Sequence, residues 1–271
     1  MQYVTVQGEE VPALGLGTWE LDGSDCRRAV AEALELGYRH IDTAQGYGNE
    51  GEIGQVLGTA PVDRGEIFLT TKIDNSNHAP DAVRRSTEES LRRLGTDYVD
   101  LLLVHWPVEF RRLPATLEAM RGLHDDGKVR HLGVSNFTPP QLERALELAP
   151  IFCDQVEFHP FLAQSSLLEL ARKHDFMLTA YSPLARGAAL ADAVLAEIAD
   201  RHHKHPAQVV LRWLLDHENV AAVPKASSRA HLESNLAVFD FSLSGEEREQ
   251  IAGLDRGDRI IDPPFAPDWE R

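Results

Sequence analysis

Short runs of apolar residues alternate along this chain with longer segments in which apolar residues recur at helical spacing. The run from 98 to 105 is apolar on both faces, which is typical of a parallel strand that is covered on both sides. Val30 and Leu34 belong instead to a segment with the spacing of an amphipathic helix. We expect Ser24 to cap that helix and Gly37 to end it.

The same alternation continues to the end of the chain. The predicted strands cover residues 14–19, 38–42, 67–72, 98–105, 129–135, 152–156, 177–181 and 220–223. The predicted helices cover the segment between Ser24 and Gly37 and residues 52–57, 80–94, 117–124, 139–148, 165–174, 189–217 with a break near Pro206, 230–238 and 245–254. A short hairpin at 3–10 precedes them, and we expect the irregular segment after Asp255 to lie over the fold as a tail.

Eight strand–helix pairs favour a single α/β barrel. Eight alternations are what a (β/α)8 TIM barrel requires, and crossovers of this length force neighbouring strands to be parallel. A doubly wound dinucleotide-binding sheet is the alternative, but Gly15-Leu-Gly17-Thr-Trp19 stops after two glycines and does not complete its phosphate loop. Since no linker or low-complexity tract divides the chain, we expect residues 1–271 to form one domain.

Composition and charge exclude several classes of function. The formal net charge of −16 would repel nucleic acid and anionic membranes. The N-terminal residues contain no basic segment followed by a long apolar run, so we expect no signal peptide, no membrane span and a cytoplasmic location. Cys26 lies in a helical pattern and Cys153 in a strand pattern, so both are expected to be packing residues rather than a disulfide.

The cations of this acidic protein are mostly arginine. Five lysines stand against 22 arginines. A lysine-poor acidic surface would suit a high-salt cytoplasm, and a GC-rich genome that favours arginine codons explains the composition equally well. In either case, each remaining lysine is a candidate for a specific role.

Four titratable residues fall at the carboxyl ends of predicted strands or just beyond them. Asp42 ends the second strand, Lys72 the third and His105 the fourth, while Tyr47 lies in the loop after the second. An aspartate after a strand often only caps a helix or closes a turn. In a barrel, however, the carboxyl ends of the strands meet at one mouth, and Lys and Asp are rarely buried unless they are paired.

These residue types suit a site that polarises a carbonyl group. We expect the Lys72 ammonium to lower the pKa of the Tyr47 phenol, and Asp42 to keep Lys72 charged and in place. His105 would donate a hydrogen bond to the carbonyl oxygen and orient it. Tyr47 would then deliver a proton as negative charge develops on that oxygen.

The chain resembles the aldo-keto reductases along nearly its whole length. The motifs that carry the resemblance are Gly37-Tyr-Arg-His-Ile-Asp-Thr-Ala44, Tyr47-Gly-Asn-Glu50, Thr71-Lys72, Leu103-Val-His-Trp-Pro107, Gly133-Val-Ser-Asn-Phe137, Gln155-Val-Glu157, Ala180-Tyr-Ser-Pro-Leu184 and Val223-Pro-Lys225. The resemblance implies a (β/α)8 barrel that reduces aldehydes and ketones with NADPH. It also implies that Asp42, Tyr47, Lys72 and His105 form the catalytic tetrad.

The resemblance further implies which residues hold the cofactor. Those expected at the nicotinamide are Ser135, Asn136, Gln155 and the stacking ring of Tyr181. Those expected at the phosphates and adenine are Ser182 and Leu184 for the pyrophosphate, Lys225 with Ser227 and Ser228 for the 2′-phosphate, and Asn235 for the base. Gly17, Thr18, Trp19 and Asp42 complete the expected set.

The segment expected at the adenine departs from the family pattern. His231 stands where the family usually has an arginine, and Ser234 where it usually has a glutamate. Arg229 would substitute for the missing arginine by stacking on the base. The expected cofactor is therefore NADP(H), with use of NAD(H) as the open alternative.

The expected substrate is a small-molecule carbonyl compound. The pocket residues implied by the resemblance are Trp19, Tyr47, His105 and Trp106, with Phe110 as a further candidate. Within the family, the compact length and the ending from Ile251 to Trp269 resemble microbial 2,5-diketo-D-gluconate reductases, and the type B enzymes, which also act on methylglyoxal, most of all. We expect a monomer with no nucleic-acid or membrane partner.

Three other interpretations were weighed against this one. Lys72 at a strand end would suit a Schiff-base enzyme, but Asp42 beside it stabilises the ammonium form. A catalytically weak NADPH-binding barrel with a regulatory or structural role remains the alternative to an enzyme. His202-His203-Lys204-His205 resembles a metal-binding tract, but adjacent histidines at a helix end point in different directions, so no metal site is expected.

Overall fold

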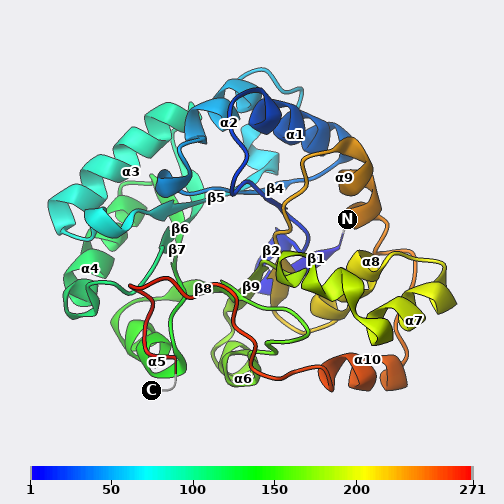
Figure 1. Cartoon of the computed structure of the whole chain (residues 1–271). Helices are drawn as coiled ribbons and strands as arrows, with labels where there is room; N and C mark the ends of the chain where they lie inside the picture. The colour runs from blue at the N-terminus through cyan, green and yellow to red at the C-terminus, as the bar shows by residue number, and fades with distance from the viewer. Residues whose placement is uncertain (1, 270–271) are drawn as a thin grey trace.

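In the computed structural model, which describes residues 2–269, eight parallel strands form one sheet surrounded by helices (Figure 1). Strands β3 to β10 are hydrogen-bonded in sequence order, and an antiparallel hairpin of β1 and β2 precedes them. The strands are β1 (Tyr3–Val6), β2 (Glu9–Pro12), β3 (Leu16–Gly17), β4 (His40–Asp42), β5 (Phe68–Ile73), β6 (Val99–Val104), β7 (Val129–Ser135), β8 (Ile151–Glu157), β9 (Met177–Tyr181) and β10 (Val220–Ala222). The predicted barrel and hairpin are confirmed.

Isolated parallel bridges join the first barrel strand to the last. Leu14 pairs with Ala222 and Gly17 pairs with Lys225, and the Gly17 amide donates to the Pro224 carbonyl at 3.1 Å. A side chain at Gly17 would not fit this seam, because its Cβ would lie 2.4 Å from the carbonyl oxygen of Val223. The closure of the barrel therefore depends on a glycine at this position.

Ten α-helices and five short 3₁₀ segments connect the strands within the described residues. The helices are α1 (Gly23–Leu36), α2 (Glu50–Leu57), α3 (Pro80–Leu94), α4 (Leu113–Asp125), α5 (Pro139–Leu148), α6 (Ser165–His174), α7 (Ala193–His202), α8 (Pro206–Leu215), α9 (Arg229–Leu236) and α10 (Gly245–Ala252). The 3₁₀ segments are η1 (Gln45–Tyr47), η2 (Arg64–Glu66), η3 (Asn75–Asn77), η4 (Phe110–Arg112) and η5 (Ala185–Ala191). None of the described helices is both long enough and apolar enough to span a bilayer.

The predicted helix boundaries are mostly right, with one cap placed wrongly. Helix α1 begins at Gly23, so Ser24 lies inside its first turn and Asp22 occupies the cap position without a side-chain hydrogen bond. Gly23 has a φ of 46°, a conformation that glycine adopts at little steric cost, and the helix can therefore begin two residues earlier than a cap at Ser24 would place it. Gly37 ends α1 in the left-handed conformation, as predicted.

The apolar residues form two core layers. The larger layer lies between the sheet and the helices, and it includes Cys26. The smaller layer fills the barrel interior, where Val6 and Val11 of the hairpin pack with Leu101 and Phe152. Cys26 and Cys153 are both free and buried, which confirms them as packing residues.

A buried carboxylate anchors the C-terminal segment over the barrel. Glu157, at the end of β8, accepts hydrogen bonds from the amides of Ile260 and Ile261 at 2.8 and 2.9 Å. The Nε2 atom of His159 lies 2.9 Å from the same carboxylate. Burial raises the pKa of Glu157, but these hydrogen bonds outweigh burial and the pKa lies below its usual value. The segment after Asp255 therefore lies beside β8, as predicted and as its red trace in Figure 1 shows.

A second buried carboxyl group, Asp154 on β8, has no such partners. Its side chain is 0% exposed, and neither oxygen has a hydrogen-bond partner of normal geometry among the described residues. Burial raises the pKa of Asp154 well above its usual value, and the Phe137 amide lowers it only in part. This carboxyl group therefore keeps its proton to higher pH in the folded protein than it does in the unfolded chain.

Asp154→Asn is expected to gain about 1–3 kcal/mol of stability relative to wild type between pH 5 and pH 8, because asparagine has no proton that the unfolded chain would release. The unfolded chain releases the Asp154 proton above about pH 4, whereas the folded chain retains it. The folded wild type therefore loses stability as the pH rises, and the asparagine variant does not. Urea unfolding at pH 5 and pH 8 measures the effect, with the exposed Asp97→Asn as the matched control. A difference in stability between the variant and wild type that is the same at pH 5 and pH 8 would contradict the raised pKa of Asp154.

Candidate active site

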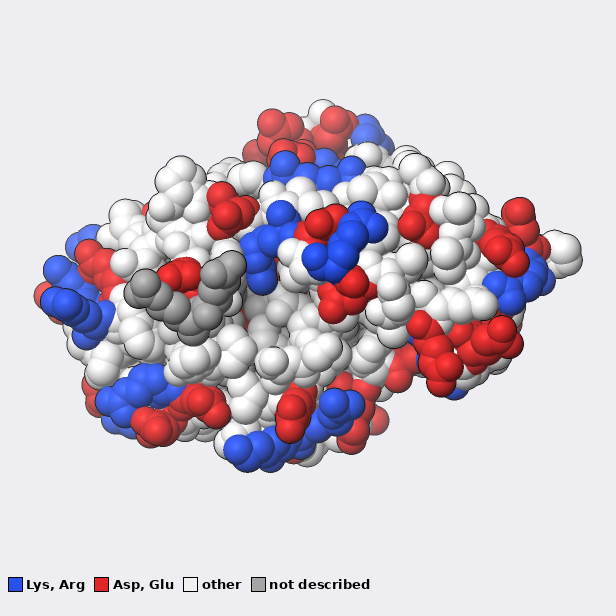
Figure 2. All heavy atoms as spheres, turned by 60° about the horizontal axis from the view of Figure 1, so that its bottom comes forward, with Lys and Arg blue, Asp and Glu red and all other residues white. Residues whose placement is uncertain are grey.

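The predicted site residues gather around one cavity at the carboxyl ends of the strands. The cavity has a volume of about 680 Å³. The face turned forward in Figure 2 is hollowed near its centre, with charged side chains on the rim and mostly uncharged atoms inside. The predicted residues that line the cavity are Gly17, Thr18, Trp19, Asp42, Tyr47, His105, Trp106, Ser135, Asn136, Gln155, Tyr181, Ser182 and Lys225.

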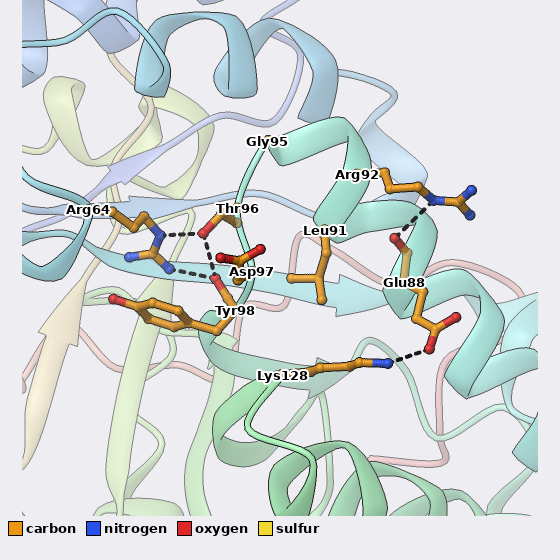
Figure 3. Close-up of a pocket in the computed structure, with 9 residues that line it drawn as sticks. All are labelled: Arg64, Glu88, Leu91, Arg92, Gly95, Thr96, Asp97, Tyr98 and Lys128. Atoms are coloured by element: carbon orange, nitrogen blue, oxygen red, sulfur yellow. Dashed lines mark hydrogen bonds and ion pairs between the residues drawn. The ribbon is translucent and has the colours of Figure 1, made fainter.

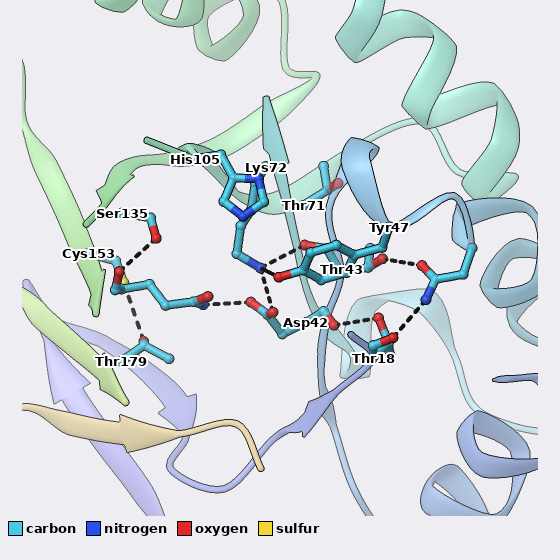
Figure 4. Close-up of polar contacts among 12 residues, drawn as sticks. Thr18, Asp42, Thr43, Tyr47, Thr71, Lys72, His105, Ser135, Cys153 and Thr179 are labelled. Carbon is cyan, nitrogen blue, oxygen red and sulfur yellow. Dashed lines mark hydrogen bonds and ion pairs between the residues drawn. The ribbon is translucent and has the colours of Figure 1, made fainter. Parts of the chain in front are cut away.

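A buried ion pair between Asp42 and Lys72 lies beneath the cavity (Figure 4). The Lys72 Nζ atom is 2.5 Å from Asp42 Oδ1, and the two side chains are 1% and 4% exposed. Lys72 also donates to the carbonyl oxygen of Thr43 at 2.9 Å. Burial lowers the pKa of Lys72, but Asp42 and Tyr47 outweigh burial and raise it overall. The ammonium group is therefore held charged inside the barrel.

Tyr47 places its hydroxyl beside this ammonium group. Lys72 Nζ lies 3.4 Å from the Tyr47 oxygen, and the ring contacts Trp19 edge-on with 4.8 Å between centroids. Lys72 does lower the pKa of Tyr47, as expected, but removal of the hydroxyl from water outweighs it and the pKa is raised overall. The expected net lowering is therefore wrong for the protein alone. Tyr47 keeps its proton through neutral pH.

His105 completes this cluster just beyond β6. Its ring lies 5.7 Å from that of Tyr47 between centroids. Burial and then Lys72 lower the pKa of His105 to about 3. The imidazole is consequently neutral at physiological pH and has one N–H to donate.

The residues expected at the nicotinamide form a hydrogen-bonded set on β7, β8 and β9. Tyr181 donates to Asn136 Oδ1 at 2.6 Å, and Asn136 Nδ2 donates to Ser135 Oγ at 3.0 Å. Ser135 donates to the Gln155 carbonyl at 2.7 Å, and Gln155 Nε2 donates to Asp42 at 2.6 Å. Asn136 has a φ of 63°, a left-handed conformation that asparagine tolerates better than most residues. This wall of the cavity is thus tied directly to the ion pair.

The residues expected at the phosphates lie near the barrel seam. Lys225 lines the cavity, and its Nζ atom lies 3.3 Å from a carboxylate oxygen of Glu20, with both side chains partly exposed. Ser182 also lines the cavity and has a φ of 46°. Arg186, which was not predicted from the sequence, adds a second cation to this part of the lining.

Besides Lys72, which lies beneath the cavity, six predicted residues do not line it. Leu184 packs against the core, and Asn235 is buried with its side chain hydrogen-bonded to Tyr38. The others lie around α9 or on η4: Ser227 is exposed, Ser228 caps α9, Arg229 pairs with Glu35 and Glu233, and Phe110 packs on Phe137. Phe110 is therefore corrected from a pocket residue to a packing residue. The three predicted residues around the start of α9, Ser227, Ser228 and Arg229, lie outside this cavity but follow directly from the Lys225 segment.

Ten further residues line the cavity that were not assigned to the site from the sequence. They are Gly46, Asp74, Asn75, Arg186, Val223, Ile260, Ile261, Asp262, Pro263 and Phe265. Half of these belong to the C-terminal segment, which was predicted to cover the barrel without assignment of its contacts. Phe265 packs edge-on against Trp106 at 5.5 Å between centroids, so this segment forms an aromatic wall with the predicted tryptophan.

The histidine tract has structural contacts instead of a shared ligand position. His202 Nε2 lies 3.0 Å from Glu247, and His205 accepts a hydrogen bond from the Ala207 amide at the start of α8. His203 ends α7 in the left-handed conformation. The rings of His202 and His205 therefore contact different elements, α10 and the start of α8.

A second and more open hollow, of about 910 Å³, lies at the opposite end of the barrel (Figure 3). It is lined by residues that precede strands, including Arg64, Asp97, Tyr98 and Lys128. Lys128 is paired with Glu88, and the Arg64 guanidinium stacks over the Tyr98 ring at 4.2 Å. The groups here are engaged with one another, and no acid–base cluster like that of Figure 4 is present among its lining residues.

Comparison with known proteins gives one consistent family. The profile of the aldo/keto reductase family matches residues 13–256. An aldo-keto reductase of Mycolicibacterium smegmatis is 43% identical over 95% of this chain and 94% of its own length. Methylglyoxal reductase DkgB of Escherichia coli O157:H7 is 40% identical over 96% of this chain and 99% of its own. A crystal structure provisionally named as a 2,5-diketo-D-gluconic acid reductase B superposes with a TM-score of 0.97 and 44% identity, over 99% of this chain and 97% of that one.

Proposed function

The chain belongs to the aldo/keto reductase family, and from this and its site we propose that it reduces small aldehydes and ketones to alcohols with NADPH. The observation that carries the proposal is the Tyr47 hydroxyl, which lies 3.4 Å from a buried, paired ammonium group at the floor of a cavity. The names of its relatives suggest two candidate substrates, methylglyoxal and 2,5-diketo-D-gluconate.

The proposed roles follow from the charge state of each residue. The neutral imidazole of His105 donates a hydrogen bond to the substrate carbonyl and orients it toward Tyr47. Tyr47 gives its proton to that oxygen as negative charge develops there. The Lys72 ammonium stabilises the phenolate that remains, and Asp42 holds Lys72 charged and in position. Water reprotonates Tyr47 after the product leaves.

The donor set of the cavity fits a nicotinamide dinucleotide. When bound, a reduced nicotinamide supplies the hydride. Ser135, Asn136 and Gln155 present hydroxyl and amide groups of the kind that bind a carboxamide, and Tyr181 presents a ring for stacking. Arg186 and Lys225 provide cations for phosphate groups on the same side of the cavity as Ser182.

Consumption of NADPH by the purified protein tests the proposal. With methylglyoxal and a panel of short aldehydes, the absorbance of the reduced cofactor is expected to fall in proportion to alcohol formed. Binding of NADPH without turnover of any carbonyl would instead favour a regulatory or structural barrel. Absence of NADPH binding would contradict both.

Lys225→Met is expected to weaken NADPH binding about tenfold and to leave NADH binding within about twofold, because only NADPH carries the 2′-phosphate. Glu20→Gln is expected to strengthen NADPH binding, since it frees Lys225 from its ion pair. Dissociation constants for both cofactors, measured by tryptophan fluorescence, check the two variants. If both variants change NADPH and NADH affinity equally, Lys225 does not read the 2′-phosphate.

A further inference from the structure

We propose that Asp74 makes this cavity select against anionic carbonyl substrates and in favour of neutral and cationic ones, an inference that rests on the proposed reductase function. Asp74 follows β5 and lines the cavity beside the loop that carries Tyr47. It was not among the residues predicted from the sequence. The proposal concerns which substrates enter, and it changes no step of the chemistry.

One oxygen of Asp74 is held by the protein, and the other lies toward the Tyr47 loop. Oδ1 accepts hydrogen bonds from the amide and the hydroxyl of Ser76, at 3.0 and 2.7 Å. Oδ2 would lie 3.2 Å from a Cβ built on Gly46, the residue before Tyr47. The hydrogen bonds from Ser76 therefore fix the carboxylate so that its second oxygen lies beside the loop of the proton donor.

Asp74 carries its charge without a compensating cation. Burial raises its pKa, but the hydrogen bonds from Ser76 outweigh burial and the pKa lies below its usual value. Among the described residues, no salt bridge includes Asp74. The two histidines whose charge would act on Asp74, His105 and His78, both have pKa values below the usual value for histidine. Of the other two carboxylates of the lining, Asp42 is paired with Lys72, and Asp262 accepts a hydrogen bond from Trp269 and interacts with Arg259.

The cations of the cavity serve the opposite wall. Lys225 lies at the seam between β3 and β10, and Arg186 lies after β9, both on the side expected to hold the cofactor phosphates. Lys72, the cation nearest to Tyr47, is neutralised by Asp42. Among the residues that line the cavity, a carboxylate on the substrate would therefore meet Asp74 without a free cation beside it; Arg259 lies outside this lining and interacts with Glu157, Tyr181 and Asp262.

Aromatic side chains complete the substrate half of the cavity. Trp19 packs on Tyr47, and Trp106 packs on Phe265, all four lining the same cavity. Aromatic faces attract cations and tolerate neutral groups, whereas they give an anion no hydrogen bond. Together with Asp74, this lining favours methylglyoxal, which is neutral, over 2,5-diketo-D-gluconate, which carries a carboxylate.

Three aldehydes of similar size test the selection: 4-carboxybenzaldehyde, 4-nitrobenzaldehyde and 4-(trimethylammonio)benzaldehyde. The measurement is kcat/KM of wild type and of Asp74→Asn for each, with NADPH. The ratio between the two enzymes cancels the intrinsic reactivity of each aldehyde. We expect Asp74→Asn to raise kcat/KM about tenfold for the anion and to lower it about tenfold for the cation, the order expected of partly solvated unit charges a few ångströms apart. The neutral aldehyde is expected to change less than about threefold, and added salt to weaken both shifts.

A matched variant separates this local effect from the charge of the whole protein. Asp97→Asn removes the same charge from the opposite end of the barrel (Figure 3) and is expected to leave all three ratios unchanged. A second readout, the quenching of tryptophan fluorescence on ligand binding, does not depend on turnover. Wild type is expected to bind phenyltrimethylammonium with a lower dissociation constant than benzoate, and Asp74→Asn is expected to lose this preference. If the ratio of kcat/KM between Asp74→Asn and wild type is the same for all three aldehydes, the proposal is overturned while the reductase function stands. Failure of wild type to reduce any of them would overturn the function itself.

Discussion

Tyr47→Phe is expected to lower kcat for methylglyoxal reduction by about 10²–10⁴-fold, the usual contribution of a positioned general acid. Phenylalanine keeps the ring that packs on Trp19 but removes the only hydroxyl within reach of the Lys72 ammonium in Figure 4. NADPH affinity is expected to stay within about twofold of wild type, because the groups proposed to hold the cofactor lie on or directly after strands β7 to β10. Steady-state kinetics and a fluorescence titration with NADPH measure the two quantities.

Tyr98→Phe is the matched control for this change. Tyr98 lies at the opposite end of the barrel, where its ring is stacked between Arg64 and Arg130. The substitution removes a phenolic hydroxyl of the same kind far from the cavity, so kcat should not change. Full activity of Tyr47→Phe would show that another group donates the proton, and equal losses in both variants would indicate a general effect on the fold.

Lys72→Met is expected to abolish measurable turnover and to destabilise the fold by about 3–5 kcal/mol, the cost of leaving a buried charge without its partner. Asp42 would remain 4% exposed beside methionine, with the amide of Gln155 as its remaining side-chain contact. Turnover falls because the Tyr47 phenolate loses the ammonium that stabilises it. Chemical denaturation and the methylglyoxal assay check the two effects.

The double variant Asp42→Asn with Lys72→Met separates stability from catalysis. Removing both charges eliminates the uncompensated one, so most of the lost stability should return. Turnover should not return, because no cation then lies near Tyr47. If the double variant is as unstable as the single one, the ion pair is not the source of the loss. If it regains turnover, Lys72 has no part in proton transfer.

The barrel could be predicted because each strand and helix has a recognisable pattern within its own residues. The run from Val99 to Val104 is apolar on both faces except for Asp100. Pro80 begins α3, and Gly95 caps its C-terminal end. The tetrad was predictable for a related reason: residues at the carboxyl ends of parallel strands must meet at one mouth, whatever the loops do. The positions of the strand ends are sufficient to place Asp42, Lys72 and His105 at this mouth.

Other parts of the site depend on chain paths that no local pattern encodes. Asp74 faces the cavity because Ser76 turns its carboxylate, and Phe265 reaches Trp106 because the tail is anchored more than 100 residues away in sequence, at Glu157. The net pKa shift of Tyr47 could not be predicted because it is the difference between two opposing effects. The sequence motif indicates the nearby Lys72 cation, which lowers the pKa, but not the burial of the hydroxyl, which raises it. Ser24 does not cap α1, because Gly23 adopts a conformation that lets the helix begin before it.

Because Glu157 holds the C-terminal segment by its main chain, the side chains with which this segment lines the cavity can be replaced. The carboxylate binds the main-chain amides of Ile260 and Ile261, and every amino acid except proline supplies such an amide. Side chains beyond this anchor, Phe265 among them, can therefore be exchanged without loss of the contact that fixes the segment. An evolving or engineered enzyme can in this way acquire new specificity from its last residues while the proton-transfer groups on β4 to β6 stay as they are.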